Sequence, residues 1–255
     1  MEKMIIKPLP IIVATILAAF TASATAGTAM RFSAKGPVVQ PKERKAYVFG
    51  YAGFDFGSDY ETIGAFDGVP DPAHCPVGYD HSDPAFDPTN VPINFDLEDG
   101  ETFGVGVGVY SQFLGGSRFE LETSYTHNEV SGVTYVDFDL PASFDVETRA
   151  LFFNYLKEVP LGKLTGYFGG GVGYANTSFR GDLDTVRFSD ESDGFAWQLV
   201  AGVDFPLTDR LSMFTQYRYM VLSNQAFTTD FGDFTTETQD NPASHAVLLG
   251  ARLSF

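Results

Sequence analysis

Apolar and polar residues alternate with a period of two along eight segments of the chain, which begin after Lys45 and continue to the final Phe255. This alternation is typical of β-strands, whose successive side chains point to opposite faces of a sheet. No stretch carries the 3.6-residue apolar stripe of an amphipathic helix. We therefore predict strands within residues 46–56, 102–113, 118–127, 148–157, 164–175, 195–205, 211–221 and 244–255.

The connections between these segments alternate between short and long. The short connections are LGGS, EVPLGK and PLTDR, which have the length and the residues of hairpin turns. The long connections, which we expect to be loops, are residues 57–101, 128–147, 176–194 and 222–243. Tight turns at one end and large loops at the other are the asymmetry of outer membrane barrels, with short periplasmic turns and long extracellular loops.

The two faces of the predicted strands differ in size and polarity. In residues 102–113 valines alternate with glycines, and in residues 118–127 Phe119 and Leu121 alternate with Arg118, Glu120 and Glu122. A soluble barrel would turn the apolar set inward and the other set to water. The second set, however, combines charges with many glycines and little lysine, which suits a narrow interior better than a soluble surface. Aromatic residues near the segment ends suit the two membrane interfaces.

The sequence therefore predicts an all-β fold, an eight-stranded antiparallel up-and-down transmembrane barrel over residues 46–255. The opening residues have the basic start, short apolar run and A-x-A site of a secretory signal peptide. The run is too short to be a membrane anchor, which needs ~20 apolar residues. We expect a signal peptide over residues 1–26, with cleavage after Ala26 or, as second choice, after Ala29. A basic periplasmic tail is expected over residues 27–45.

The charge distribution supports the same asymmetry between the two ends. Together, residues 57–100, 127–147, 176–193 and 221–243 hold 24 of the 33 acidic residues and only 2 of the 16 basic ones. A net charge of −17 argues against nucleic acid as a partner. The single cysteine, Cys75, excludes an internal disulfide. We therefore expect an acidic surface at the loop end of the barrel.

Three stretches carry a resemblance to a known family: YFGGGVGY at 167–174, YRY at 217–219 and HAVLLGARLSF at 245–255. With them, the chain after the signal resembles the OmpA-type and opacity-type eight-stranded outer membrane barrels, a porin-like family, without a peptidoglycan-binding domain. The resemblance implies a place in the cell outer membrane of a Gram-negative envelope. It implies that the terminal Phe255 is an assembly signal read by the barrel-assembly machinery. It identifies a fold rather than an activity.

Several charged residues are expected to point into the barrel and form a lumen charge network, because buried charges must pair. The members are Arg118, Glu120, Glu122, Asp204, Arg218 and Arg252. The favoured role for this network is structural, as a plug of the lumen; a gated narrow path is the alternative. The glycines on the same face are expected to make room for bulky neighbours, with an internal cavity as the alternative.

Chemistry beyond the barrel is weakly indicated. His127 and His245 invite comparison with lipid-modifying outer membrane enzymes, but Ser244 and its neighbour His245 point to opposite faces and cannot act together. The Asp-rich residues 181–194 do not match a calcium loop, and residues 71–88 form at best a weak metal site. We expect no catalytic residues, no metal site and no cofactor.

The expected function is that of an integral outer membrane barrel with a structural or surface role. It would display acidic loops for adhesion or envelope integrity. The alternatives are a narrow diffusion pore and, remotely, a lipid-modifying enzyme. The expected partners are outer membrane lipids and lipopolysaccharide, together with the assembly machinery, and a monomer is favoured.

Overall fold

A computed structural model describes most of the chain after residue 45. The described residues are 46–57, 60–66, 91–112, 116–135, 138–183, 186–223, 228–230, 234–238 and 242–255. The expected signal peptide and basic tail lie outside them. Within these ranges the secondary structure is β-strand, and no helix is long and apolar enough to cross a membrane.

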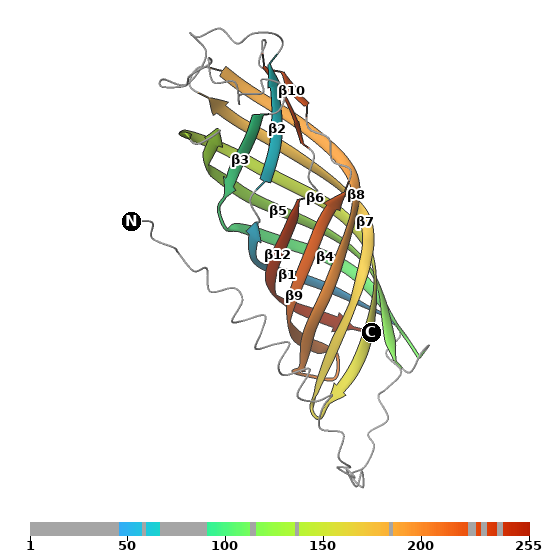
Figure 1. The fold of residues 1–255 in the computed structure, drawn as a ribbon. Helices are drawn as coiled ribbons and strands as arrows, with labels where there is room; N and C mark the ends of the chain where they lie inside the picture. The colour runs from blue at the N-terminus through green and yellow to red at the C-terminus, as the bar shows by residue number, and fades with distance from the viewer. Residues whose placement is uncertain are drawn as a thin grey trace, which may run out of the picture. The chain divides into compact units, whose positions relative to one another are not determined.

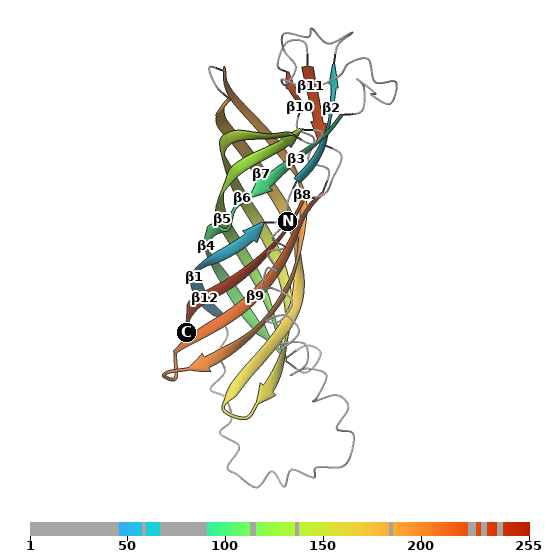
Figure 2. The ribbon, with the colours of Figure 1, turned by 60° about the vertical axis from the view of Figure 1, so that its left-hand side comes forward.

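Eight antiparallel strands close into a ring, which confirms the predicted fold (Figures 1 and 2). Each strand of the ring pairs with the next strand, and the last strand pairs with the first, with Tyr47 opposite Ser254. In chain order the ring consists of β1 (Ala46–Gly57), β4 (Gly100–Ser111), β5 (Ser117–Tyr135), β6 (Phe138–Leu161), β7 (Leu164–Leu183), β8 (Val186–Pro206), β9 (Leu211–Ser223) and β12 (Ala243–Ser254). Each contains most or all of one of the eight predicted segments.

The tight turns lie together at one end of the barrel. The β6–β7 turn contains Gly162 at φ 70°, and the β4–β5 turn contains Gly116 at φ 97°, a backbone region that favours glycine. The amide of Glu158 donates to the carbonyl of Gly116, at 3.3 Å, and Ser254 donates to Arg210 in the β8–β9 turn, at 2.8 Å. The C-terminus therefore lies at the turn end.

The predicted long loops are wrong in part, because strand structure extends into all four. Residues 128–147 continue β5 and β6 as one ladder up to Tyr135 opposite Phe138, and residues 176–194 continue β7 and β8 up to Leu183 opposite Val186. The two-residue period continues there with polar and β-branched residues, such as Asn128, Val130 and Val146, which are buried. The many acidic residues in these extensions led to the prediction of loops.

Four further strands occupy the other two connections. They are β2 (Tyr60–Phe66), β3 (Val91–Leu97), β10 (Thr228–Asp230) and β11 (Phe234–Thr238). They pair in the order β10–β11–β2–β3, and β3 joins the ring through β5. In Figure 2, β2, β10 and β11 lie beyond the end of the ring that is opposite the tight turns.

The outer surface of the ring is apolar. Its exposed side chains include Val105 (59% exposed), Leu199 (53%) and Leu249 (58%), which come from well-separated strands. A continuous patch of large apolar side chains with these exposures would be unfavourable in contact with water. Aromatic pairs border this surface: Phe103 with Tyr125 at 4.9 Å between ring centroids, and Phe119 with Tyr155 at 5.4 Å.

The interior contains large rings as well as small and charged residues. Tyr47, Phe49 and Tyr51 of β1 point inward and are buried, opposite Gly108, Gly106 and Gly104 of β4. A Cβ atom at any of the three glycines would collide with the ring opposite. These glycines therefore make room for bulky neighbours. The expected pattern of large residues outside and small or charged residues inside is therefore wrong in part, because β1 and other strands also bury large residues such as Tyr167 and Phe214.

Candidate functional site

The structure places all six residues of the expected lumen network inside the barrel. Arg118, Arg218 and Arg252 are 0–1% exposed, and Glu120, Glu122 and Asp204 are at most 8% exposed. They come from β5, β8, β9 and β12, and the two-residue period turns each of them inward. They form two groups along the barrel axis.

The group nearer the tight turns centres on Asp204 of β8. Its carboxylate accepts a hydrogen bond from Arg118 at 2.8 Å and another from Arg252. Arg252 also lies 3.6 Å from Glu120, which accepts a hydrogen bond from the Tyr47 hydroxyl at 2.6 Å. The guanidinium of Arg118 stacks over the Tyr167 ring, 4.2 Å from its centroid.

The second group lies further from the turns and centres on Glu122 of β5. Its carboxylate accepts hydrogen bonds from Arg218 at 3.3 Å, from Asn154 at 2.7 Å and from the Tyr51 hydroxyl. Arg218 also donates to Thr102 at 2.8 Å. The Gln198 side chain donates to Asn154 at 2.8 Å and extends the group across to β8.

The six buried residues of the two groups carry three carboxylates and three guanidinium groups, and the partly exposed Glu158 lies 3.5 Å from Arg118 at the edge of the first group. In a low-dielectric interior an unbalanced charge costs several kcal/mol, so the balance favours a stable, filled lumen. Buried rings and aliphatic side chains pack against the charges, among them Tyr167, Phe214, Leu156 and Leu248. The geometry is that of a plug built from ion pairs and rings.

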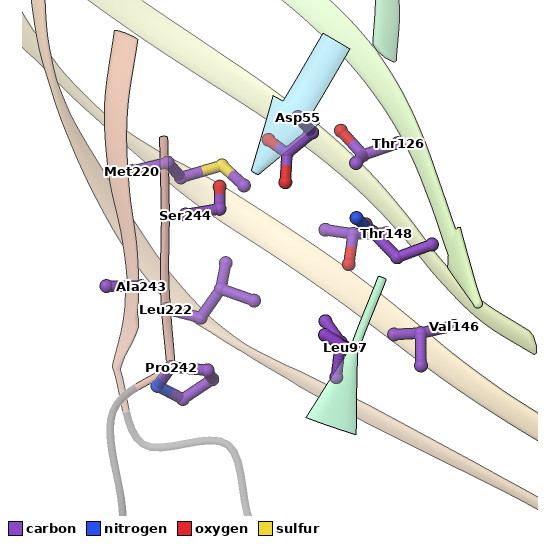
Figure 3. A pocket seen from close by; sticks show the side chains of 11 residues that line it. Asp55, Leu97, Thr126, Val146, Thr148, Met220, Leu222, Pro242, Ala243 and Ser244 are labelled. Carbon is purple, nitrogen blue, oxygen red and sulfur yellow. The ribbon is translucent and has the colours of Figure 1, made fainter. Parts of the chain in front are cut away.

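A small pocket lies beyond the plug, at the end of the ring away from the turns (Figure 3). Its polar lining consists of Asp55, Thr126, Asn128, Thr148 and Ser244. Its apolar lining includes Leu97, Val146, Met220 and Leu222. In Figure 3 the Asp55 carboxylate lies between the Ser244 and Thr126 side chains.

A polar patch lies on the outer face of β5, β6 and β7 and begins at the level of Tyr125. Arg149 is opposite Tyr125 in the ladder and its side chain is 65% exposed, and that of Arg180 is 53% exposed. Glu147 holds both, at 3.2 Å and 3.9 Å. His127, Glu129 and Asp145 lie nearby, with one ligand atom of each within 4.8 Å of the others.

A carboxylate on the neighbouring strand is fixed in the same region. Asp193 of β8 accepts hydrogen bonds from the Tyr174 hydroxyl at 2.7 Å and from Asn176 at 3.0 Å. The Tyr174 bond and then the Asn176 bond lower the pKa of Asp193 below its ordinary value. Asp193 is one of the acids in residues 181–194, and its oxygens are used by these bonds. Residues 71–88 lie outside the described residues.

The two histidines considered for catalysis contact no serine hydroxyl among the described residues. His245 contacts the Tyr217 hydroxyl through Nδ1, and its neighbour Ser244 points into the barrel, where its hydroxyl has no hydrogen-bond partner. His127 lies 3.8 Å from Asp145 and its Nδ1 is unpartnered. Among the described residues neither histidine forms the serine–histidine contact that nucleophilic catalysis requires.

Sequence reasoning missed several polar members of the interior. Tyr47, Tyr51, Asn154 and Gln198 complete the hydrogen bonds of the two groups, and Asp55 faces the pocket. The inward orientation of Asp55 could have been predicted, because Asp55 is in the same two-residue period as Tyr47 and Tyr51. The register that brings Asn154 and Gln198 to Glu122 could not be read from the sequence.

The comparisons with known proteins give a fold and no family. No family model and no curated protein matches the sequence. Among solved structures, the Neisserial surface protein A is 13% identical over 82% of this chain and 97% of its own, with a TM-score of 0.44. The outer membrane protein OprG from Pseudomonas aeruginosa is 14% identical over 83% and 97%, with a TM-score of 0.48.

The outer membrane protease OmpT from Escherichia coli is also similar, at 7% identity over 85% of this chain and 98% of its own, with a TM-score of 0.45. These values indicate no more than barrel architecture, and the fold assignment here rests on the strand pairing.

Proposed function

We propose that this chain is an integral outer membrane barrel with a structural or surface role, and that its lumen is plugged rather than conducting. The single observation that carries the proposal is the combination of an apolar outer face with a packed interior in which three arginines are paired with Glu120, Glu122 and Asp204. A closed ring satisfies its backbone hydrogen bonds without solvent, which lipid requires.

The aromatic residues at the borders of the apolar face support membrane insertion. Trp197 packs edge-on against Tyr219, with 5.7 Å between ring centroids, and Tyr219 lies 4.9 Å from the His245 ring. Tyrosine and tryptophan prefer the membrane–water interface, because they combine an apolar ring with a polar group. The tight turns would face the periplasm and the strand extensions the cell exterior.

The exposed arginines beyond the aromatic border suit lipid phosphates. Arg149 and Arg180 present guanidinium groups outward at the level where the outer leaflet's headgroups would lie. A guanidinium binds phosphate through two parallel hydrogen bonds, which makes arginine the favoured residue for such contacts. Lipopolysaccharide is therefore the proposed lipid partner on this face.

Phe255 is proposed to serve assembly. Its side chain is 66% exposed at the turn end, and its backbone amide donates to Ala46 at 3.0 Å, so it lies at the seam between the first and last strands. An aromatic residue that ends the closing strand is available to the assembly machinery before the ring closes.

Single-channel conductance tests the plug. Protein purified from outer membranes would be shown to be folded by a gel mobility that changes on heating, and then measured in a planar bilayer beside Arg218→Ala and the exposed control Arg149→Ala. We expect no steady conductance from wild type. A steady conductance in wild type that Arg218→Ala alters and Arg149→Ala does not would instead establish a narrow pore.

The surface role is tested in cells. Deletion of the gene is expected to increase sensitivity to detergent or to reduce adherence to surfaces. Restoring the chain with residues 67–90 replaced by a short neutral linker keeps the strands of the ring and removes the acidic residues of that segment. Recovery of envelope integrity without adherence would assign integrity to the barrel and adherence to the loop. A deletion without effect on either property would contradict the proposal.

A further inference from the structure

Asp55 is the exception to the charge balance of the interior. It is 1% exposed, and both of its carboxylate oxygens are buried without a hydrogen-bond partner. The other buried acids of the lumen, Glu120, Glu122 and Asp204, each lie within 4 Å of an arginine. Burying an unpaired carboxylate is costly, so it must bind something or become neutral.

No arginine is free to pair with Asp55. The guanidinium of Arg218, in the group further from the turns, already bonds Glu122, Tyr51 and Thr102. Arg118 and Arg252 both bind Asp204 in the group nearer the turns. With three arginines balanced against three other carboxylates, the charge of Asp55 is left over.

Polar side chains line the pocket beside the Asp55 carboxylate. The Ser244 hydroxyl lines the same pocket and also has no partner. The Thr126 hydroxyl lies on the Asp55 side in Figure 3 and donates to Thr102 at 3.0 Å, so its lone pairs are available, whereas the Thr148 hydroxyl contacts Thr177 at 3.2 Å. The Asn128 side chain also lines the pocket, and its amide nitrogen donates to the backbone carbonyl of Glu98 at 3.2 Å. Carboxylate, hydroxyl and amide oxygens are the ligands of hard cations.

The size of the pocket limits its occupant. The space available to the centre of a water-sized sphere is about 20 Å³, compared with the ~10–15 Å³ that one water needs. A small inorganic ion with a water molecule fits this space, and an organic ligand does not.

We propose that the pocket binds one small monovalent cation of sodium size, held by Asp55 with Ser244 and the neighbouring oxygens. One positive charge balances the single unmatched carboxylate. A divalent ion would leave a net positive charge beside Arg218 in a poorly solvated site. The bound cation would join β1, β5, β6 and β12 at the outer mouth of the plug.

Sodium-23 NMR relaxation and thermal unfolding test the proposal on full-length protein purified from outer membranes in detergent. Sodium chloride would be titrated against N-methyl-D-glucamine chloride at constant ionic strength. We expect saturable broadening of the sodium signal, and an unfolding midpoint that rises with sodium as a ligand that binds the folded state requires. Replacing sodium by calcium at equal ionic strength is the divalent arm.

Three variants separate the site from a general charge effect. Asp55→Asn keeps the side-chain shape and is expected to weaken sodium binding by at least about tenfold. Ser244→Ala keeps the carboxylate, and we expect a smaller loss of about threefold. Asp209→Asn removes one exposed charge in the β8–β9 turn and should bind sodium like wild type. A heat-dependent gel mobility shows that each variant is folded.

Two results would overturn the proposal. If wild type shows no saturable sodium dependence, Asp55 is a neutral carboxylic acid in the folded protein and the pocket holds water alone. If calcium produces the effect and sodium does not, or if Asp55→Asn retains the sodium dependence of wild type, the monovalent site at Asp55 is wrong.

Discussion

Arg118 and Asp204 are 86 residues apart in the chain and are joined by a 2.8 Å hydrogen bond inside the barrel. Arg118 follows the β4–β5 turn and Asp204 precedes the β8–β9 turn, so the bond links two strands that are not neighbours in the ring. Such bonds hold the ring across its lumen, in addition to the ladders that hold it around its circumference.

Loss of the buried Arg218 should destabilise the barrel strongly. Arg218→Ala leaves Glu122 buried without its counter-charge, and we expect a loss of ~3–5 kcal/mol in the free energy of unfolding. Arg149→Ala removes an exposed guanidinium and should cost at most about 1 kcal/mol. Urea unfolding of the two variants in detergent compares them; equal losses would contradict a role for the buried pair.

Filling the space of an interior glycine should also destabilise the barrel. Gly106→Ala places a methyl group against the Phe49 ring, and we expect a loss of ~1–3 kcal/mol. Gly50→Ala is the matched control, because its new methyl group would meet neighbours only at 3.6 Å. Urea unfolding should rank Gly106→Ala well below Gly50→Ala. A Phe49→Leu second substitution should recover part of the loss if the clash is its cause.

Removing the terminal aromatic should affect assembly and not the folded state. Phe255→Ala is expected to lower the amount of folded protein in the outer membrane several-fold. The purified variant should unfold within ~0.5 kcal/mol of wild type, because the side chain is exposed at a strand end. Quantitative gels of membrane fractions and urea unfolding measure the two quantities. Normal amounts in the membrane would remove the assembly role.

Asp193 should titrate below an ordinary aspartate. Its pKa is lowered by the Tyr174 and Asn176 hydrogen bonds, so the carboxylate form is favoured in the folded protein. The contribution to stability is therefore present above the unfolded pKa of about 3.9, and is lost as pH falls through the lower folded value. Carbon-13 NMR of the carboxyl should show Tyr174→Phe moving the pKa of Asp193 upward. An unchanged titration would mean that the Tyr174 bond is absent in solution.

Much of the barrel could be predicted from the sequence, because a strand between lipid and a narrow lumen must alternate. Phe103, Val105 and Val107 point outward and the glycines between them inward for that reason. Beyond the apolar band the outer residues are no longer selected by lipid. Residues 128–147 and 176–194 therefore read as loops although their strands continue.

The pairing inside the lumen could not be predicted, because it depends on register and on strands that are distant in sequence. The sequence placed Glu122 inward but did not indicate Asn154 and Gln198 as its partners. The missed Asp55 shows a further limit of pattern reading. Its alternation assigned it to a face, but the absence of a neutralising arginine is visible only when all the interior charges are placed together.

The pairing of β1 with β12 sets the order in which this protein can mature. The other seven strand pairs of the ring join strands that follow one another along the chain, whereas this pair joins the first strand of the ring to the last. Until the last strand arrives, the first carries an open edge of unpaired backbone groups that can capture another chain. A nascent or truncated form that stops before residue 243 lacks β12, so the edge of β1 stays unpaired. Whether such a form pairs with other chains depends on how long its open edge is kept away from them, and not on the stability of the finished barrel.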